Sequence, residues 1–234
     1  DGVIAGGLTG LWLLFLSGGA MTGRIGRAVA FGFGCFVTGL AYFGFNYALT
    51  GDALRSPQAI YLDALWGAGA NAFGFGPAIG PPEGTWRALD PVYGHGPYEG
   101  ALNTLHNLTS LQFDLFGWGV GSLALIAVLL VAGRLTRTDR LMVIFVTVTV
   151  ATMFFYWFSG SFYIGPRYWF IAAFPLILLS ARGATVVGDL LGPSGPARAG
   201  SAIGLLAAFS VLVFTPWKSV TFHHGFENVH GTIR

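Results

Sequence analysis

The residue with the clearest chemical potential is an arginine in a short aromatic segment. Arg167 lies in the segment Ser159–Tyr168 and is the only charged residue between two apolar runs. The aromatic residues around it are Tyr156, Trp157, Phe162, Tyr163, Tyr168 and Trp169. One interpretation is an arginine that extends its charged end to water from an aromatic belt at a membrane surface. The other is a phosphate ligand, because a guanidinium is always charged and its planar fork matches phosphate oxygens.

A second group of polar residues follows a glycine-rich segment at helical spacing. His95 and Glu99 are four residues apart, and Asn103 comes four residues later. These side chains could share a metal ion, but protein metal sites usually take three or four ligands in a closed geometry. Pro97 lies between His95 and Glu99, so regular helix at His95 is not expected. We therefore predict no metal site here and assign no cofactor.

Several other motifs that carry chemistry are missing from the sequence. The segment Gly74–Pro77 lacks a following Gly-Lys-Ser/Thr, which excludes a nucleotide-binding P-loop. No Gly-x-Ser-x-Gly nucleophile elbow occurs. Cys35 is the single cysteine, which excludes a disulfide framework and a cysteine metal site. The catalytic residues of any reaction therefore stay unknown at this point.

The composition indicates that these residues belong to a membrane protein. Of the 234 residues, 54% are hydrophobic and only 9% are charged, whereas about a quarter of the residues in an average protein are charged. A helix needs about 20 apolar residues to cross a bilayer. Six stretches approach that length: 3–20, 28–49, 116–133, 141–158, 168–187 and 201–217. We therefore expect an all-α polytopic membrane protein with about six transmembrane helices, the fifth kinked at Pro175.

The basic residues predict how this bundle is oriented. Three short connections hold seven of the twelve basic residues: Arg24, Arg27, Arg134, Arg137, Arg140, Arg182 and Arg198. Arginine and lysine in short loops favour the cytoplasmic side. The long loop 50–115 then lies outside the cell, together with most of the acidic residues.

The last third of this outer loop has the pattern of an amphipathic helix that begins at Pro97. Apolar residues recur on one side, and Glu99, Asn103 and Asp114 belong to the opposite polar stripe. One interpretation is an interfacial helix with its apolar side to lipid and its polar side to water. The alternative is that the polar stripe faces an active-site cavity.

An ordered set of short motifs resembles a family of membrane enzymes. The motifs are Phe45–Asp52, Gly74–Gly76, Gly94–Asn103, Leu115–Trp118 and Gly165–Tyr168, followed by Pro175 and Ala181–Gly183. In that order they resemble the C-terminal half of bacterial polytopic glycosyltransferases of the GT-C type. Relatives of this type include protein O-mannosyltransferases and the lipid A aminoarabinose transferase. Ala53 stands where the family pattern has proline.

The resemblance implies transfer of a sugar from a polyprenyl-phosphate donor to an acceptor at the outer face of the bacterial cytoplasmic membrane. It implies that Arg167 binds the donor phosphate and that the cavity is lined by Tyr163, His95, Glu99, Asn103 and Asn46. The catalytic carboxylate of such enzymes belongs to an N-terminal half, so we assign no catalytic base here. The implied partners are the lipid donor, an unknown acceptor and membrane lipids, and no nucleic acid.

These observations predict a chain organisation and leave one alternative function open. We expect residues 1–216 to be the C-terminal part of a transmembrane glycosyltransferase module and residues 217–234 to begin an extracytoplasmic tail or domain. The alternative is a transporter or a non-catalytic subunit of the cell envelope. A transporter would show buried charges within its spans or inverted repeats, and the sequence has neither feature.

Overall fold

The computed structural model describes residues 2–82, 94–158 and 165–221, and these residues form helices with no β-strand among them. The chain divides into two units, residues 1–100 with 154–158 and residues 101–153 with 159–234. Two helices, α4 (Pro97–Asp114) and α6 (Arg137–Phe154), each contribute residues to both units. The predicted all-α class is confirmed for the described residues.

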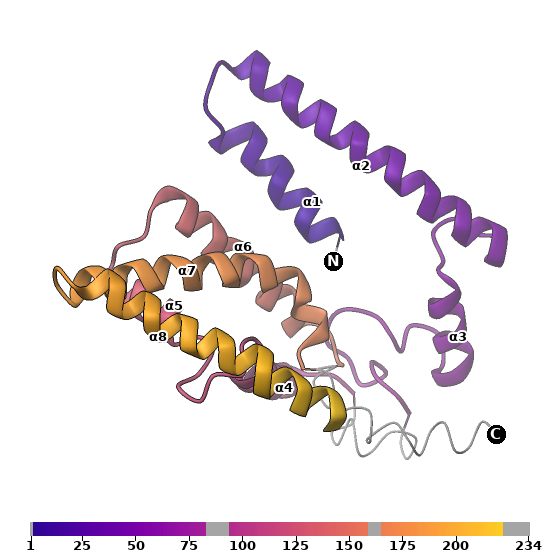
Figure 1. The fold of residues 1–234 in the computed structure, drawn as a ribbon. Coiled ribbons are helices and arrows are strands. Elements are labelled where there is room, and N and C mark those ends of the chain that lie inside the picture. The colour runs from indigo at the N-terminus through magenta and orange to yellow at the C-terminus, as the bar shows by residue number, and fades with distance from the viewer. Residues whose placement is uncertain (1, 83–93, 159–164, 222–234) are drawn as a thin grey trace. The chain divides into compact units, whose positions relative to one another are not determined.

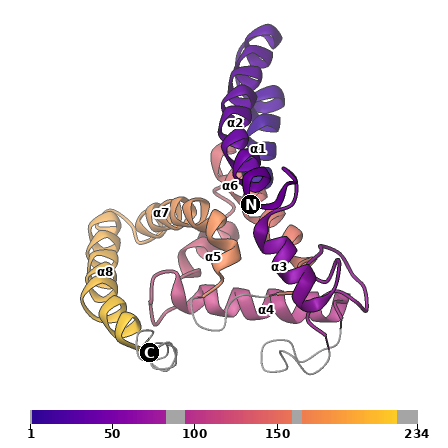
Figure 2. The same ribbon diagram turned by 90° about the vertical axis from the view of Figure 1, so that its right-hand side faces the viewer.

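The first unit begins with a pair of antiparallel apolar helices. α1 (Gly2–Leu11) continues into the π-helix η1 (Trp12–Leu16), and α2 (Met21–Thr50) runs back beside them (Figures 1 and 2). The turn between them is closed by arginines: Arg27 donates hydrogen bonds to Ser17 Oγ at 3.0 Å and to the Gly18 carbonyl at 2.6 Å. Arg24 likewise donates from Nε to the Gly19 carbonyl at 2.9 Å, so both arginines satisfy carbonyls in the turn after η1, in addition to any effect on orientation.

The motif Phe45–Asp52 ends α2 and turns the chain into the long loop. Gly51 adopts a left-handed conformation with φ of 74° and donates its N–H to the Tyr47 carbonyl. The Thr50 hydroxyl bridges the Asn46 carbonyl and the backbone of Asp52. Asn46 is fully buried and donates from Nδ2 to the Ala53 carbonyl at 3.2 Å, so the motif works as a helix stop.

In the described residues of the segment 50–115, which are 50–82 and 94–115, the chain forms helices and hydrogen-bonded turns. Ser56 caps α3 (Pro57–Trp66) by accepting from the Ala59 N–H at 3.1 Å. Residues 67–82 then pack against the segment after α6, where Asn71 Oδ1 accepts hydrogen bonds from Tyr156 Oη and Trp157 Nε1. The Phe73 and Tyr156 rings stack with their centres 4.9 Å apart.

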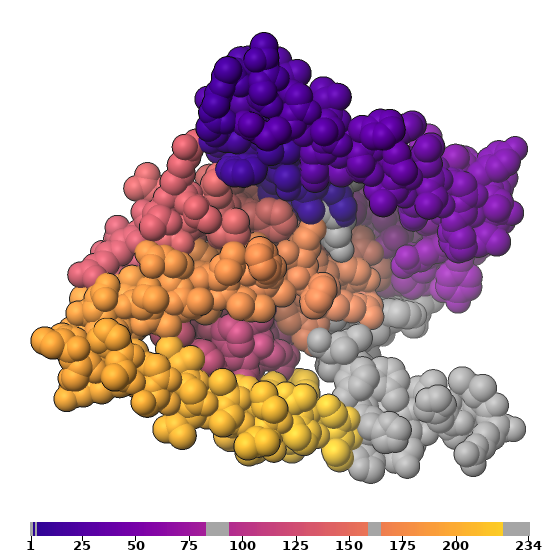
Figure 3. All heavy atoms as spheres, turned by 45° about the horizontal axis from the view of Figure 1, so that its top comes forward, coloured from indigo at the N-terminus to yellow at the C-terminus, as the bar shows by residue number. Residues whose placement is uncertain are grey.

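The second unit contains the helices α5 (Ala124–Val131), most of α6, α7 (Ala173–Leu190) and α8 (Gly195–Phe209). A 3-10 helix, η2 (Arg167–Ala172), leads into α7, and a π-helix, η3 (Ser210–Phe214), continues α8. Figure 3 shows α7 in orange and α8 in yellow packed along each other.

Glycines allow the close packing of this unit. A β-carbon at Gly183 of α7 would overlap the Leu125 carbonyl of α5, and one at Gly195 would overlap the Gly188 carbonyl across the turn between α7 and α8. Small residues at such contacts let helix backbones approach each other, as they do in membrane proteins.

Two ion pairs join connections that are expected, from their arginines, to lie on the same side of the membrane. Arg134 pairs with Asp189 at 3.3 Å, and Arg182 pairs with Asp139 at 3.4 Å. Asp139 also forms a capping box with Thr136 at the start of α6, because each side chain accepts from the other residue's backbone N–H. Burial alone would raise the pKa of Asp139, but these hydrogen bonds and the Arg182 guanidinium hold its pKa below the usual value.

Three helices of the described chain are long and apolar enough to cross a membrane: Met21–Thr50, Arg167–Leu190 and Gly195–Thr221. They correspond to the second, fifth and sixth expected spans. The first expected span is a shorter apolar helix, Ile4–Leu16, and α6 covers most of the fourth. The expected count of six is not confirmed.

The third expected span, 116–133, differs most from its prediction. Only the eight residues of α5 form an α-helix there, a length of about 12 Å at 1.5 Å per residue. Residues 115–123 form turns, because Gly117 and Gly121 have φ of 68° and 92° and Ser122 and Leu123 donate backbone hydrogen bonds to Gln112. At the fifth span, Pro175 is the third residue of α7, directly after the 3-10 helix η2 (Arg167–Ala172) changes into α-helix.

The close contact at Gly183 predicts a specific effect of adding one methyl group. Gly183→Ala should destabilise the protein by about 1–3 kcal/mol, since the new β-carbon would push α5 from α7. Thermal unfolding of the purified protein in detergent measures this. Gly200→Ala is the matched control, because Gly200 is helical and a β-carbon there would meet no atom within 4 Å. Equal midpoints for the two variants would contradict the packing at Gly183.

Candidate functional site

The helix α4 carries its polar residues inward and its apolar residues outward. Glu99 and Asn107 are each 4% exposed, whereas Tyr98 is 72% exposed and Leu105 is 63% exposed. Leu102, Leu108 and Phe113 are also exposed. This distribution agrees with an apolar side that faces lipid, but it contradicts the interpretation in which the polar side faces water. The helix starts at Pro97, as predicted.

Two glycine-containing segments are joined immediately before α4. The backbones of Gly76 and His95 exchange hydrogen bonds, N–H to carbonyl in both directions, each of 2.9 Å. Gly94 has φ of 67°, and a β-carbon there would lie 2.7 Å from the Gly76 carbonyl oxygen. Only glycine fits this approach without strain. The motifs Gly74–Gly76 and Gly94–Asn103, separate in the sequence, therefore meet at this bridge.

His95 and Glu99 form a buried hydrogen-bonded pair beside the bridge. Their side chains are 0% and 5% exposed, and His95 Nδ1 lies 3.0 Å from Glu99 Oε2. The other ring nitrogen, Nε2, lies 3.1 Å from the Phe154 carbonyl oxygen at the end of α6. The imidazole thus connects the start of α4 with the end of α6. Phe75 packs on the ring, with ring centres 5.3 Å apart.

The hydrogen-bond pattern fixes how many protons the pair holds. A carbonyl oxygen only accepts, so Nε2 must carry a hydrogen and donate it to Phe154. The contact between Nδ1 and Oε2 then needs one more proton, held either by the imidazole or by the carboxyl group. In both cases the pair is neutral as a whole, which lowers the cost of burying it.

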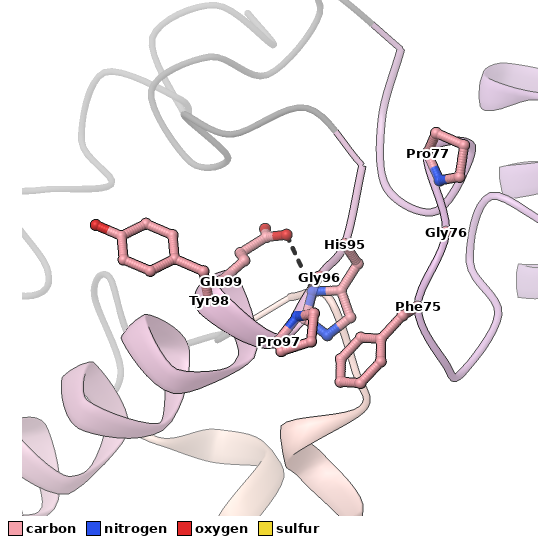
Figure 4. A pocket seen from close by; sticks show the side chains of 8 residues that line it. All are labelled: Phe75, Gly76, Pro77, His95, Gly96, Pro97, Tyr98 and Glu99. Carbon is pink, nitrogen blue, oxygen red and sulfur yellow. Dashed lines mark hydrogen bonds and ion pairs between the residues drawn. The ribbon is translucent and has the colours of Figure 1, made fainter.

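A pocket of about 430 Å³ opens beside this pair (Figure 4). Its walls are Phe75, Gly76, Pro77, His95, Gly96, Pro97, Tyr98 and Glu99, all within the first unit. Aromatic and proline surfaces dominate it, and the Glu99 carboxyl group, the His95 ring and the Tyr98 hydroxyl are the polar side-chain groups among its lining residues. Such a pocket suits an uncharged polar ligand with one apolar face.

The remaining residues of the predicted site are not in this pocket. Asn46 lies at the end of α2 and is fully buried; its Oδ1 has no hydrogen-bond partner among the described residues. Asn103 lies half-buried one turn after Glu99. Tyr163 lies outside the described residues.

Arg167 begins η2 in the second unit, and its side chain is exposed. Its guanidinium carbon lies 5.1 Å from the centre of the Tyr168 ring, within the range of a cation–π contact. Trp157 and Trp169, which the sequence suggests for an aromatic belt, are each only 3% exposed. The Trp169 Nε1–H has no hydrogen-bond partner among the described residues. These two tryptophans therefore pack inside the protein instead of marking the membrane surface.

Sequence reasoning missed two groups that hold the site together. Asn71 accepts hydrogen bonds from both Tyr156 and Trp157, and the Phe154 carbonyl accepts from His95. Asn71 belongs to no recognisable motif. A particular backbone carbonyl cannot be singled out from the sequence, because every residue has one.

Within the described parts of the chain, no three His, Cys, Asp or Glu side chains come together as a metal site would require. Both ring nitrogens of His95 are engaged in hydrogen bonds in this arrangement. Comparison with protein-family models, with curated proteins and with solved structures finds no match for this chain.

The proton count of the buried pair predicts different effects for two substitutions of Glu99. Glu99→Gln should cost less than about 1 kcal/mol, because the amide N–H can donate to Nδ1 of a neutral His95. Glu99→Leu should cost about 1–3 kcal/mol, because it leaves Nδ1 buried without a partner. Unfolding midpoints in detergent distinguish the two. If both substitutions destabilise the protein equally, the neutral hydrogen-bonded arrangement is wrong.

Proposed function

We propose that this chain is part of a membrane glycosyltransferase that takes a sugar from a polyprenyl-phosphate donor. The observation that carries the proposal is the convergence of Gly74–Gly76 with Gly94–Glu99. These are two of the motifs that resemble GT-C glycosyltransferases, and together they wall a pocket with one buried carboxylate. Aromatic walls and a carboxylate acceptor are groups that a sugar ring can use for stacking and hydroxyl hydrogen bonds.

The proposed orientation places this pocket outside the cytoplasm. The Arg-rich connections lie at the cytoplasmic side, and the loop that includes α3 and α4 lies at the opposite face. The exposed apolar side of α4 then contacts lipid at that surface. A donor with a long prenyl chain reaches its enzyme through lipid, so an outer-face site bordered by an interfacial helix suits this class of substrate.

In the proposed reaction an acceptor nucleophile attacks the anomeric carbon of the sugar. The bond between that carbon and the phosphate oxygen breaks, and polyprenyl phosphate leaves with the bonding electron pair. The Arg167 guanidinium stabilises the charge that develops on the leaving phosphate. The proton of the acceptor passes to a base that we do not assign to this chain. Within the first unit, His95 is a positioning residue that holds the Glu99 carboxyl group at the pocket.

Substitution of Arg167 tests the proposed phosphate role. Arg167→Ala in the full-length protein should lower sugar transfer about a hundredfold, the usual cost of removing one charge-stabilising donor. Arg167→Lys should retain an intermediate rate, because it keeps the charge but loses the two-pronged geometry. The measurement is release of undecaprenyl phosphate from a panel of undecaprenyl-phosphate-linked sugars, in native membranes that contain the acceptor.

Arg198→Ala is the control, because Arg198 is an exposed arginine at the start of α8 and has no part in the proposed chemistry. It should behave as the unsubstituted protein does. A normal rate for Arg167→Ala would refute the phosphate role. Absence of release from every donor in the panel by the unsubstituted protein would refute the proposed reaction.

A further inference from the structure

The chain has a single lysine, and it is paired with an aspartate that contacts Gly165, two residues before Arg167. Lys218 is the only lysine among the twelve basic residues. It lies in the last turns of the helix Gly195–Thr221 and donates from Nζ to Asp114 Oδ1 at 2.9 Å. The Lys218 side chain is 38% exposed, and that of Asp114 is 23% exposed. The ion pair is therefore partly shielded but still accessible from outside the protein.

Asp114 places this lysine beside the turn that carries Arg167. A β-carbon at Gly165 would lie only 3.1 Å from Asp114 Oδ2, so the backbone of Gly165 packs directly on the carboxylate. The Arg167 N–H donates to the Gly165 carbonyl at 2.7 Å, which folds the turn tightly. One carboxylate thus contacts both the Lys218 ammonium and the turn that begins η2. All these residues belong to the second unit.

The helix that carries Lys218 is fixed against the end of α4 by three successive contacts. Ser210 donates to the Phe116 carbonyl and accepts from Trp118 Nε1 at 3.0 Å. The ring of Phe214 packs directly on Gly117, where a β-carbon would overlap it. Lys218 then reaches Asp114. Ser210, Phe214 and Lys218 follow at intervals of four residues, so one side of the helix contacts the segment 114–118 along its length.

The cationic groups of Lys218 and Arg167 are of the kind that bind a phosphate ester. Arg167 and Lys218 each carry a positive charge, and Asp114 carries the negative charge that holds Lys218. A polyprenyl-phosphate-linked sugar is a phosphodiester with a single negative charge. An ammonium group has three N–H donors, and the hydrogen bond to Asp114 uses one of them. The neighbouring Trp217 is 60% exposed, which suits the headgroup level of a membrane.

We propose that Lys218, held by Asp114 beside the Gly165–Arg167 turn, is a second cationic ligand for the phosphate of the lipid donor. This inference rests on the proposed function, because it takes Arg167 as the first ligand. It adds a residue from the last helix to the site and assigns Asp114 as the residue that positions it.

Binding of undecaprenyl phosphate to the full-length protein in phosphatidylcholine nanodiscs tests the inference. Lys218→Ala should weaken binding about tenfold, and Lys218→Arg should restore most of the loss because it keeps the charge at this position. Arg198→Ala should bind as the unsubstituted protein does. Lys218→Ala within twofold of the unsubstituted protein would overturn the role of Lys218. If Arg167→Ala still binds at least tenfold more weakly in that case, the proposed function stands without it.

Amine labelling of the unsubstituted protein provides a measurement that needs no variant. Acetylation of Lys218, quantified by mass spectrometry of its peptide, should slow at least threefold when undecaprenyl phosphate is added. Phosphatidylglycerol and inorganic phosphate at the same concentration separate a specific lipid-phosphate site from general attraction of anions. Equal protection by phosphatidylglycerol, or no protection by undecaprenyl phosphate, would overturn the inference.

Discussion

The hydrogen bonds of His95 hold together segments of the first unit that are far apart in the sequence. Its backbone pairs with Gly76, its Nδ1 with Glu99 at the start of α4, and its Nε2 with the Phe154 carbonyl at the end of α6. Gly100 of α4 also lies against that carbonyl. In a chain with so few charged residues, a buried imidazole and carboxyl group persist only because each satisfies the other. His95 therefore fixes the walls of the pocket, because it binds Gly76 through its backbone and Glu99 through its side chain.

The need of buried polar groups for partners also explains the orientation of α4. On a water-soluble protein a surface helix would turn its polar side outward, whereas α4 turns much of its apolar side outward. Its polar residues Glu99 and Asn107 turn inward, and most of its leucines and its aromatic residues turn outward. An exposed apolar stripe of this kind is stable where the surroundings are lipid. The ion pairs in the second unit follow the same principle, because Asp139, Asp114 and Asp189 each contact a cation instead of standing alone. Charges in this protein are few, and these three aspartates are each paired with a cation.

Sequence patterns predicted the helical class and the start of α4 at Pro97, because hydropathy and proline act locally. They also singled out His95 and Glu99 by helical spacing. They failed at 116–133, where apolar composition resembles a span but left-handed glycines and the Gln112 hydrogen bonds make turns. They could not find Asn71 or the Phe154 carbonyl, since tertiary contacts alone give these groups their roles. Lys218 gained its significance only from its contact with Asp114.

The central claim is that the protein binds a polyprenyl phosphate at its outer face through Arg167. An experimental structure of the full-length protein in nanodiscs with undecaprenyl phosphate tests it most directly. The account predicts that the phosphate lies within hydrogen-bonding distance of the Arg167 guanidinium, on the side of the membrane opposite the Arg-rich loops. A phosphate bound elsewhere, or an Arg167 side chain that faces away from it, would contradict the account.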